Sequence, residues 1–372
     1  MHILHVVGAR PNFMKAAPVI AAFREYGVRQ TLVHTGQHYD AFMSDIFFQQ
    51  LGIPEPDFNL AVGAGSHAAQ TAEIMSRFEP VVIAANPDLV VVYGDVNSTL
   101  SAALVCAKLR IPVGHVEAGL RSFDRDMPEE INRILTDQLA DLLFTPSEDG
   151  DLNLLREGID GQKIYRVGNV MIDTLVKLLP AAKRVTRADD VFESPYALVT
   201  LHRPSNVDDP ATLDSVIRTL DTLSREIRIV FPVHPRTRKQ LESLRGWTPG
   251  RNIQLIDPVG YLEFLALQLH AVLVVTDSGG IQEETTYLGV PCLTVRNNTE
   301  RPVTTTIGTN VLVGQDRETL LSEARRVLSG RAKKGGIPPL WDGRAAHRIA
   351  QIALCAYVER VGVPFEVARA GR

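Results

Sequence analysis

Short runs of apolar, mostly β-branched residues alternate along this chain with longer segments in which apolar residues recur every three or four positions. The short runs predict strands at residues 2–7, 31–35, 89–95, 113–117, 142–146 and 164–168. The longer segments predict helices at residues 43–52, 67–85, 98–109, 129–141 and 151–158. This alternation predicts a mainly parallel sheet covered by helices on both faces.

The pattern stops in a charged, weakly periodic segment and then restarts, so we place the connection between two domains around residues 169–195. The second series of strands is predicted at residues 197–202, 227–234, 253–258, 271–277, 291–296 and 310–314. Its helices are predicted at residues 211–226, 236–244, 261–270, 281–289 and 317–328.

The predicted fold is therefore α/β, with two Rossmann-like doubly wound domains at residues 1–170 and 171–344. We expect a last amphipathic helix, within about residues 345–372, to pack back onto the first domain. In a doubly wound domain, ligands bind outside the carboxyl ends of the strands, so the residues that follow each strand are the first candidates for chemistry.

Bulk properties narrow the class of protein. A length of 372 residues favours two domains, and 45% hydrophobic with 22% charged residues is typical of a globular chain. A net charge of −4 argues against nucleic acid as a partner. The N-terminus resembles no signal peptide and no segment has the roughly 20 apolar residues of a membrane helix, so we expect a soluble, cytoplasmic protein. Its three cysteines are far apart in apolar runs, which is typical of reduced thiols.

The stretch TDSGGIQEE, residues 276–284, predicts an anion site. A strand that ends at Asp277 is followed by Ser278, Gly279 and Gly280 at the start of a helix, where exposed N–H groups can approach phosphate oxygens. Glu284 lies about one and a half turns further on and can accept hydrogen bonds from a ribose diol. The alternative is a tight turn with a serine cap.

Cations near strand ends complete the features of a diphosphate site. Arg10 and Lys15 flank the turn after the first strand, and Arg301 lies in the segment NTERP. The alternative for each is a solvated surface charge. Pro11, at the predicted start of a helix, favours the functional interpretation of the first pair.

Carboxylates also follow the strands of the first domain. Asp95 and Glu117 each end an apolar run, and Glu129 and Arg133 are one turn apart on a predicted helix. Carboxylates at such positions need partners, and their surroundings can shift their pKa values into a range useful for proton transfer. The structural alternative is that Asp95 caps a helix, Glu117 pairs with Arg121, and Glu129 pairs with Arg133.

Histidines occupy equivalent places in the second domain, where His202 and His234 end two strands and can serve as acids, bases or phosphate donors. A metal site could be drawn from His34, His38 and Asp40, but no third strong ligand has metal-binding spacing, so we expect no metal. The segment VGAGSHA, residues 62–68, fits a dinucleotide motif but follows a poor strand, so we expect no nicotinamide cofactor.

Many segments in register resemble one family over nearly the whole chain. They are GARPNFMKAAPVI, HTGQHYD, YGDVNSTL, GHVEAGLRS, MPEEINRILTD, GNVMID, TLHRP, FPVHPRT, IDPVGYLEF, TDSGGIQEE and NTERP. The chain is thereby identified as a member of the non-hydrolysing UDP-N-acetylglucosamine 2-epimerases of bacteria and archaea. This resemblance implies GT-B architecture with a central cleft, a homodimer, a UDP-sugar and UDP as ligands, and no metal or cofactor.

The resemblance also implies roles for individual residues. The catalytic residues it implies are Asp95, Glu117, Glu129 and His202. The substrate contacts it implies are Arg10, Lys15, Arg133, His234, Phe264, Ser278, Gly279, Gly280, Glu284 and Arg301, with Phe264 near the uracil. It does not assign the carboxylate that removes the C2 proton.

The expected reaction converts UDP-N-acetylglucosamine to UDP-N-acetylmannosamine by elimination and re-addition of UDP through 2-acetamidoglucal. Because C2 is not adjacent to a carbonyl and no credible dinucleotide site is present, elimination is the natural route. The alternatives are a C2 epimerase of a UDP-2,3-diacetamido sugar acid, a GT-B UDP-sugar glycosyltransferase and a non-catalytic UDP-sugar sensor. Many bacterial members bind a second UDP-sugar as activator. Gln37, His38 and Arg203 match the residues involved, whereas Ser205 replaces a glutamate that many relatives have.

Overall fold

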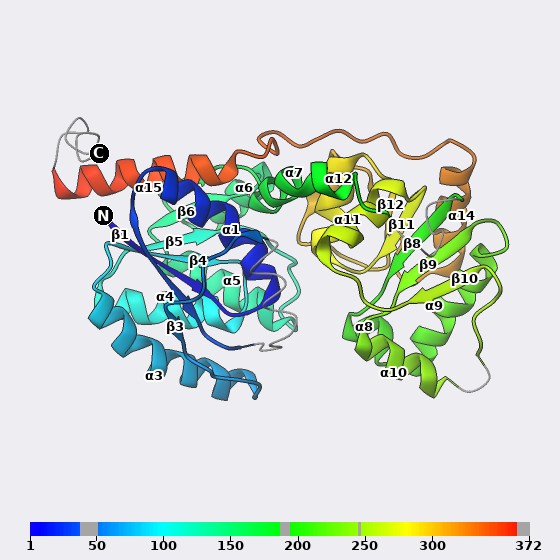
Figure 1. The fold of residues 1–372 in the computed structure, drawn as a ribbon, viewed down its shortest axis with the longest axis horizontal. Coiled ribbons are helices and arrows are strands. Elements are labelled where there is room, and N and C mark those ends of the chain that lie inside the picture. The colour runs from blue at the N-terminus through cyan, green and yellow to red at the C-terminus, as the bar shows by residue number, and fades with distance from the viewer. Residues whose placement is uncertain (38–50, 187–193, 245–246, 363–372) are drawn as a thin grey trace. The chain divides into compact units, whose positions relative to one another are not determined.

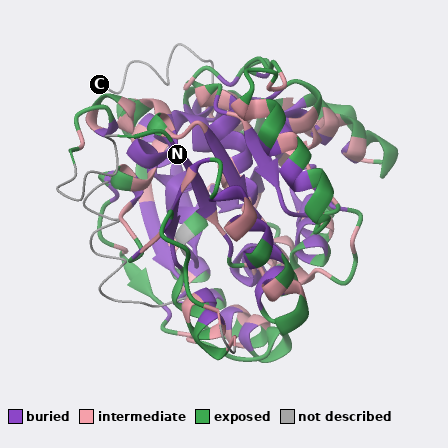
Figure 2. Cartoon of the chain, turned by 90° about the vertical axis from the view of Figure 1, so that its right-hand side faces the viewer, coloured by how far each residue is buried: buried purple, intermediate pink, exposed green. Residues whose placement is uncertain are grey.

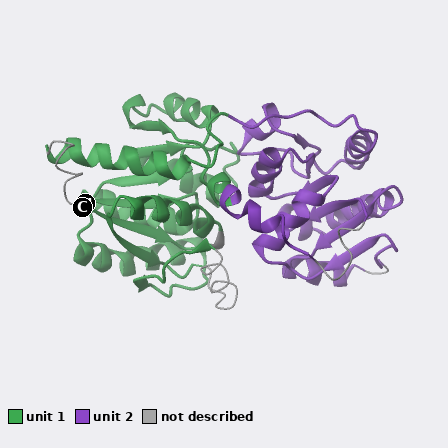
Figure 3. Ribbon diagram, turned by 45° about the horizontal axis from the view of Figure 1, so that its top comes forward, with its two compact units in different colours: residues 1–174, 339–372 green, residues 175–338 purple. Residues whose placement is uncertain are grey.

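The computed structural model describes residues 1–37, 51–186, 194–244 and 247–362. The chain divides into two compact units, residues 1–174 with 339–372 and residues 175–338 (Figure 3). The first boundary falls within the segment where the sequence predicts the connection between domains. Most of the helix predicted at residues 43–52 lies outside the described residues, as do His38 and Asp40.

Unit 1 contains a seven-stranded parallel sheet with the order β3-β2-β1-β4-β5-β6-β7 (Figure 1). Its strands are β1 His2–Val7, β2 Arg29–His34, β3 Phe58–Asn59, β4 Leu89–Tyr93, β5 Val113–Val116, β6 Leu142–Thr145 and β7 Ile164–Arg166. Its helices are α1 Arg10–Glu25, α3 His67–Ala85, α4 Asn97–Leu109, α5 Pro128–Leu139, α6 Glu148–Arg156, α7 Val170–Ala182 and α15 Ala345–Val361. α7 runs across the boundary into unit 2.

The apolar strands of unit 1 are buried because helices cover the sheet on both faces. α3, α4 and α5 pack side by side on one face, and α1 packs with α15 on the other (Figure 1). Every residue of β1, β4 and β5 is buried, and Figure 2 shows the strands as the buried centre of the fold. This two-sided burial explains why these strands are continuous apolar runs instead of alternating ones.

The C-terminal helix α15 belongs to unit 1. The carboxylate of Asp173 accepts hydrogen bonds from the backbone N–H groups of Ala345 and Ala346, at the first turn of α15. Just before the helix, the buried Trp341 donates its indole N–H to the carbonyl of Pro146 at 2.9 Å. These contacts satisfy donors that a helix start and a buried indole would otherwise leave unpaired.

Unit 2 contains a six-stranded parallel sheet with the order β10-β9-β8-β11-β12-β13. Its strands are β8 Tyr196–Thr200, β9 Arg228–Pro232, β10 Ile253–Ile256, β11 Leu273–Thr276, β12 Cys292–Thr294 and β13 Asn310–Leu312. Its helices are α8 Pro204–Val207, α9 Pro210–Leu223, α10 Pro235–Ser243, α11 Tyr261–His270, α12 Gly279–Leu288, α13 Pro302–Thr306 and α14 Arg317–Leu328.

Alternate residues of β8 enter two different cores. Ala197 and Val199 join the cluster that includes α9 and α14, while Tyr196 and Leu198 join the cluster with Leu267 of α11. The sheet of unit 2 is therefore also buried on both faces, and the predicted α/β fold with two parallel sheets is confirmed.

Each sheet reverses its strand order at one point, and that point positions the candidate site. In unit 1 the reversal lies between β1 and β4, and in unit 2 it lies between β8 and β11. The connections from these two strand pairs leave in opposite directions, and in doubly wound folds ligands bind outside the carboxyl ends of the strands at such a point. The candidate residues after β1 and β4 and those after β8 and β11 lie at these switch points.

The sequence missed several short elements. β3 has two residues and pairs with β2, although its surroundings predict a poor strand. The helices α8 and α13 have four and five residues, which is too short to produce a recognisable apolar period.

Candidate functional site

The switch point of unit 1 holds a group of paired charges that we call the carboxylate cluster: Lys15, Asp95, Glu117, Glu130 and Arg133. Lys15 lies in the second turn of α1, and its ammonium forms an ion pair with Glu117, which directly follows β5. Both side chains are buried. An ion pair buried to this extent needs both partners, because removing either leaves an uncompensated charge.

Gly94 makes room for this ion pair. Its φ of +62° is in the left-handed region, and a Cβ atom at this position would lie 2.6 Å from the Lys15 Nζ and 3.2 Å from a Glu117 carboxylate oxygen. The glycine that precedes Asp95 is therefore required both by its backbone conformation and by the space for the two charges.

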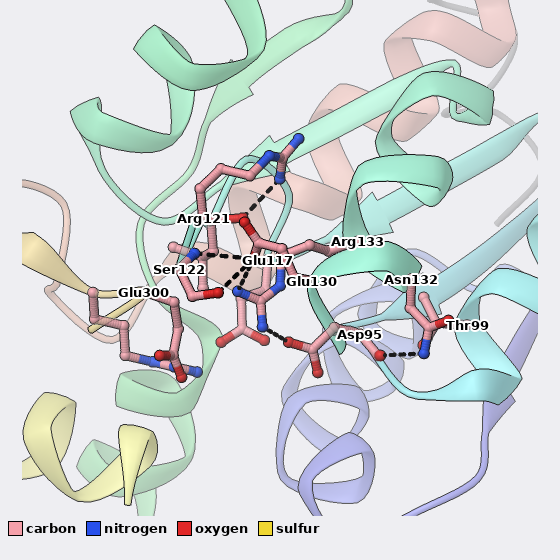
Figure 4. A network of polar contacts seen from close by, with 12 residues as sticks. Asp95, Thr99, Glu117, Arg121, Ser122, Glu130, Asn132, Arg133 and Glu300 are labelled. Atoms are coloured by element: carbon pink, nitrogen blue, oxygen red, sulfur yellow. Dashed lines mark hydrogen bonds and ion pairs between the residues drawn. The ribbon is translucent and has the colours of Figure 1, made fainter. Parts of the chain in front are cut away.

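Arg133 connects Asp95 to Glu130 (Figure 4). One guanidinium nitrogen donates to the Asp95 carboxylate and another donates to Glu130 at 3.0 Å. The Arg133 and Glu130 side chains are almost fully buried, whereas that of Asp95 is 26% exposed. Asp95 is thus held in place by an arginine while part of its carboxylate remains accessible to a ligand.

Glu130 fixes the loop that follows Glu117. Its carboxylate accepts hydrogen bonds from the backbone N–H groups of Ser122 and Phe123, both at 2.9 Å, and from the Ser122 hydroxyl at 3.0 Å. With Arg133 as a fourth donor, both oxygens of this buried carboxylate are used. Glu130 therefore has a structural role that the sequence analysis missed. The signal available was its three-residue spacing from Arg133.

Glu129, the neighbour that the resemblance assigns to catalysis, lies in the first turn of α5 and is exposed. The structural alternatives for Asp95 and Glu117 are wrong. Val96 is the N-cap residue of α4, and Arg121 pairs with Asp137 and Glu157 instead of Glu117. Arg10 is the first residue of α1, after the N-cap residue Ala9.

The switch point of unit 2 holds a second group that we call the α12 cluster: His202, Asp277, Gly279, Glu300 and Arg301. Asp277 is fully buried between β11 and α12, and its carboxylate accepts hydrogen bonds from the backbone N–H groups of His202 and Arg203. Burial alone would raise the pKa of Asp277, but the hydrogen bonds from His202 and the backbone outweigh it and the pKa is lowered. Asp277 is therefore an ionised acceptor at the base of the turn.

Asp277 also orients the His202 ring. The Nδ1 atom of His202 lies 3.1 Å from an Asp277 oxygen, and an ionised carboxylate can only accept, so Nδ1 carries a proton. The ring is 43% exposed and lies 6.0 Å, centroid to centroid, from that of His234. The two histidines that the sequence assigned to equivalent strand ends are thus neighbours. Nothing in the sequence predicts this orienting function of Asp277.

Gly279 provides space for Arg301. A Cβ atom at Gly279 would lie 2.4 Å from Arg301 Nη1 and 2.9 Å from a Glu300 oxygen, so only glycine fits without displacing them. Ser278 is the N-cap residue of α12 but its side chain makes no capping hydrogen bond, and Gly280 is partly exposed. The serine-cap alternative is therefore wrong, and the first turn of α12 has no side-chain cap.

Glu300 holds three arginines at this helix start. It accepts from Arg301 at 2.6 Å and Arg296 at 2.8 Å, and lies 3.5 Å from Arg203. Burial would raise the pKa of Glu300, but the charges of these arginines outweigh burial and hold the pKa well below its ordinary value. Arg301 also pairs with Glu283 at 2.7 Å. These contacts fix the guanidinium of Arg301 beside the N-terminus of α12, which itself favours an anion.

Glu284 and Phe264 line the other side of α12. The Glu284 carboxylate accepts hydrogen bonds from the Tyr261 hydroxyl at 2.9 Å and from the Gln268 amide at 2.5 Å. The Phe264 ring is half-buried against the apolar cluster of Tyr196, Leu198 and Leu267. Tyr261 and Gln268 were not predicted, because nothing in a sequence indicates which neighbouring helix supplies a carboxylate with donors.

The residues matched to an activator site lie in different environments. Gln37 is buried, and its side-chain oxygen accepts hydrogen bonds from the backbone N–H and hydroxyl of Ser98. Arg203 donates to the Asp277 carbonyl at 3.0 Å, and His38 lies outside the described residues. Within the described residues, no group of three or more His, Cys, Asp or Glu side chains is placed to hold a metal ion.

The fold and the two clusters define a two-unit α/β protein with paired carboxylates in one unit and an arginine-lined helix start in the other. The family model for UDP-N-acetylglucosamine 2-epimerases matches residues 21–354. A UDP-N-acetylglucosamine 2-epimerase from Methanocaldococcus jannaschii is 42% identical over 95% of this chain and 98% of its own length. This chain belongs to the UDP-N-acetylglucosamine 2-epimerase family, whose members are isomerases with a GT-B-like fold.

Two further comparisons bear on the ligand. The crystal structure of the M. jannaschii enzyme in complex with UDP-GlcNAc and UDP matches with a TM-score of 0.88, covering 95% of this chain and all of that chain. A UDP-2,3-diacetamido-2,3-dideoxy-D-glucuronate 2-epimerase from Pseudomonas aeruginosa is 44% identical over 94% of this chain and 99% of its own length. Among the described residues, no helix is both long and apolar enough to cross a membrane.

Proposed function

We propose that this protein interconverts UDP-N-acetylglucosamine and UDP-N-acetylmannosamine by inverting the configuration at C2. The observation that carries the proposal is the pairing of Asp95 with Arg133 and of Glu117 with Lys15 at the switch point of unit 1, in a chain of this family. Two carboxylates with fixed positions and cationic partners suit a reaction that removes a proton from one face of a carbon and returns it to the other.

The proposed route is elimination of UDP followed by re-addition. A carboxylate removes the C2 proton, the C1–O bond breaks with its electron pair leaving on the UDP oxygen, and 2-acetamidoglucal remains. In the second half, the UDP oxygen attacks C1 and a proton is delivered to the opposite face of C2. The first half creates negative charge on the departing diphosphate, so cations fixed beforehand around that diphosphate lower the barrier.

The two switch points then have separate functions. In unit 1, the proton-transfer groups are drawn from Asp95, Glu117 and Glu129. In unit 2, the N-terminus of α12 with Ser278, Gly279, Gly280 and Arg301 binds the diphosphate, in accord with the fixed guanidinium beside an uncapped helix start. His202, held by Asp277, presents Nε2 toward the leaving group as proton donor or hydrogen-bond partner.

The remaining expected substrate contacts also divide between unit 1 and unit 2. Arg10, Lys15 and Arg133 provide positive charge in unit 1, and His234 adds a second imidazole beside His202. Glu284 is proposed to bind the ribose diol and Phe264 to lie near the uracil. Tyr261 and Gln268 hold the Glu284 carboxylate in place, and a carboxylate can accept further hydrogen bonds from the ribose hydroxyls.

One observation favours a second substrate. The P. aeruginosa relative, at 44% identity, is named for a diacetamido sugar acid. Assaying the protein with each UDP-sugar separately compares the two substrates, because the C3 substituent is the part of the sugar that differs near the reacting carbon.

We also infer a homodimer from the family resemblance. Sedimentation velocity of the purified protein measures this oligomeric state directly.

The reaction is tested by incubating the purified protein with UDP-N-acetylglucosamine in D2O and following the sugar protons by NMR. Deuterium at C2 together with a manno product supports epimerisation, and trapped 2-acetamidoglucal supports the elimination route. A substrate that stays unchanged until an acceptor is added would instead indicate a glycosyltransferase. Binding without any exchange at C2 would rule out catalysis of this reaction.

A further inference from the structure

A chain of four buried or partly buried charges lies directly behind the turn that carries Asp95. It consists of His115, Asp137, Arg121 and Glu157, and we call it the His115 chain. His115, in the middle of β5, is fully buried. Its Nε2 atom lies 2.8 Å from the Gly94 carbonyl oxygen, and its Nδ1 atom lies 2.7 Å from an Asp137 oxygen. Both ring nitrogens therefore face oxygen atoms.

The contacts of Asp137 fix its charge. One of its oxygens faces His115, and the other accepts hydrogen bonds from the Gly119 N–H at 3.1 Å and Arg121 at 2.7 Å. Burial would raise the pKa of Asp137, but its contacts with His115 and Arg121 outweigh burial and the pKa is lowered. Asp137 is consequently an acceptor toward both neighbours.

Arg121 carries the chain to the surface. It is buried, and it binds Glu157 through two parallel hydrogen bonds of 2.7 Å and 2.6 Å, the geometry that gives arginine–carboxylate pairs their strength. The Glu157 side chain is 29% exposed. With a protonated His115 the chain has two positive and two negative charges, so it carries no net charge into the interior.

We infer that His115 is a doubly protonated imidazolium and acts as a positioning residue for the Gly94–Asp95 turn. A carbonyl oxygen and an ionised carboxylate can only accept, so a ring placed between them needs a proton on each nitrogen. A neutral ring would leave one of these short contacts between two acceptors. Such a contact is costly where no water can intervene.

The His115 chain fixes the backbone on which the two carboxylates lie. The Gly94 N–H donates to the Val116 carbonyl at 3.0 Å while His115 donates to the Gly94 carbonyl, so both sides of this residue are tied to β5. Asp95 follows directly, and its own carbonyl accepts from Asn132 at 2.9 Å. The same chain reaches Gly119, two residues after Glu117, through Asp137. One buried chain therefore fixes the backbone next to both carboxylates.

Other charged groups also face this turn. Lys15 and Glu117 lie on the side of Gly94 where a Cβ atom would be, and they pair with each other. Toward the ring of His115, the charged contact is Asp137, with Arg121 and Glu157 behind it. The imidazolium is thus balanced by its own carboxylate and does not depend on the charges that take part in the proposed reaction.

The protonation state is tested first, on the wild-type protein labelled with ¹⁵N in its histidines. Long-range ¹H–¹⁵N spectra are recorded from pH 6 to pH 8.5, and the His115 signals are those missing from the spectrum of His115→Gln. We expect both ring nitrogens of His115 to show the shifts of protonated nitrogens at pH 8, because each faces an acceptor oxygen. One unprotonated nitrogen at pH 8 would overturn the inference.

The positioning role is tested by kinetics, and this part rests on the proposed function. His115→Leu removes both donors, so we expect kcat to fall at least 100-fold with KM and UDP affinity changed less than threefold. His115→Gln keeps one N–H that can reach the Gly94 carbonyl, and we expect it to recover at least tenfold of the lost kcat. Equal kcat in the two variants, or losses that appear only in KM, would overturn the positioning role.

Two controls keep these outcomes distinct. Glu73→Gln removes an exposed ion pair with Arg77 on α3 and should leave kcat within twofold of wild type. If His115→Leu fails to fold, Glu157→Gln weakens the exposed end of the same chain and should lower kcat severalfold at unchanged KM. An unchanged kcat in that variant would count against the inference. If the wild-type protein shows no C2 exchange, the proposed function fails, while the nitrogen shifts still decide the state of His115.

Discussion

Lys15 and Glu117 form a buried ion pair although 102 residues separate them in the sequence. Parallel β1 and β4, and β4 and β5, bring the ends of their strands together, and Lys15 reaches Glu117 from the second turn of α1. A cation assigned to the nucleotide thus neutralises a carboxylate assigned to proton transfer. We expect the behaviour of each to depend on the other, because a buried charge without its partner is strongly destabilised.

Gly94→Ala should therefore reduce both activity and stability. The substitution forces an L side chain into a left-handed conformation, which costs about 1–2 kcal/mol, and it also displaces Lys15 Nζ, which lies 2.6 Å from the position of the new methyl group. Gly289→Ala is the matched control, since its φ is +72° but a Cβ atom meets nothing within 4 Å. Gly94→Ala should lower the melting temperature more than Gly289→Ala does, because it also disturbs a buried ion pair, and only Gly94→Ala should lose at least tenfold in C2 exchange.

Asp95→Asn should abolish most of the exchange while UDP still binds. The amide keeps the shape of the carboxylate but cannot accept a proton, and loss of a general acid or base costs on the order of 100-fold or more in rate. Isothermal titration with UDP should give an affinity within about threefold of wild type. Asp214→Asn, which removes an exposed ion pair with Arg218, is the control. Wild-type exchange in Asp95→Asn would remove this residue from the catalytic set.

The sequence predicts the architecture well because both sheets are parallel and buried on two faces. Continuous apolar runs such as Leu89–Tyr93 end in turns with polar residues, and the alternation with helices leaves little freedom in the fold. The same logic places Asp95, Glu117, His202 and Ser278 after their strands. Whether a residue follows a strand depends on nearby residues, so the sequence alone predicts it.

The sequence predicts the hydrogen-bond and ion-pair partners of these side chains less well, because the partners come from distant elements that meet only in the fold. Glu129 and Glu130 are adjacent, and the sequence cannot tell which of them turns inward to hold Ser122 and Phe123. The sequence indicates that Asp277 is part of a turn, yet its carboxylate accepts a hydrogen bond from the backbone N–H of His202, 75 residues away. His115 appears as one apolar-strand residue among others until Gly94 and Asp137 are brought to its two nitrogens.

Gly279→Ala should weaken UDP binding without changing the backbone conformation. Its φ is not in the left-handed region, so the new methyl group acts only by displacing Arg301 and Glu300, which would lie 2.4 Å and 2.9 Å away. We expect at least a tenfold loss of UDP affinity by isothermal titration. Gly161→Ala, where the nearest atom lies at 3.7 Å, should bind UDP within twofold of wild type. Equal affinities in the two variants would separate Arg301 from diphosphate binding.

Asp173 makes stability depend on pH in an unusual direction. Burial raises the pKa of this carboxyl to about 6, more than its hydrogen bonds from Ala346 and Ala345 lower it. A pKa raised on folding means that the folded protein binds the proton more tightly, so the stability contributed by the protonated form is present below about pH 4 and is lost as pH rises through about 6. The shift corresponds to about 3 kcal/mol between those limits.

Asp173→Asn should remove this pH dependence, because the amide does not titrate and can still accept a hydrogen bond from the first turn of α15. The quantity to measure is the difference in melting temperature between the variant and wild type, from pH 3.5 to pH 7.5. We expect the variant to gain on wild type as pH rises from about 4 to about 6 and to keep a constant difference above that range. Asp88→Asn, at a partly exposed carboxylate that binds the N–H of His2 at 2.7 Å, controls for the loss of a backbone contact. A difference that stays constant across the whole range would show that the pKa of Asp173 does not change on folding. In that case the two N–H donors at the start of α15 would offset the effect of burial on this pKa.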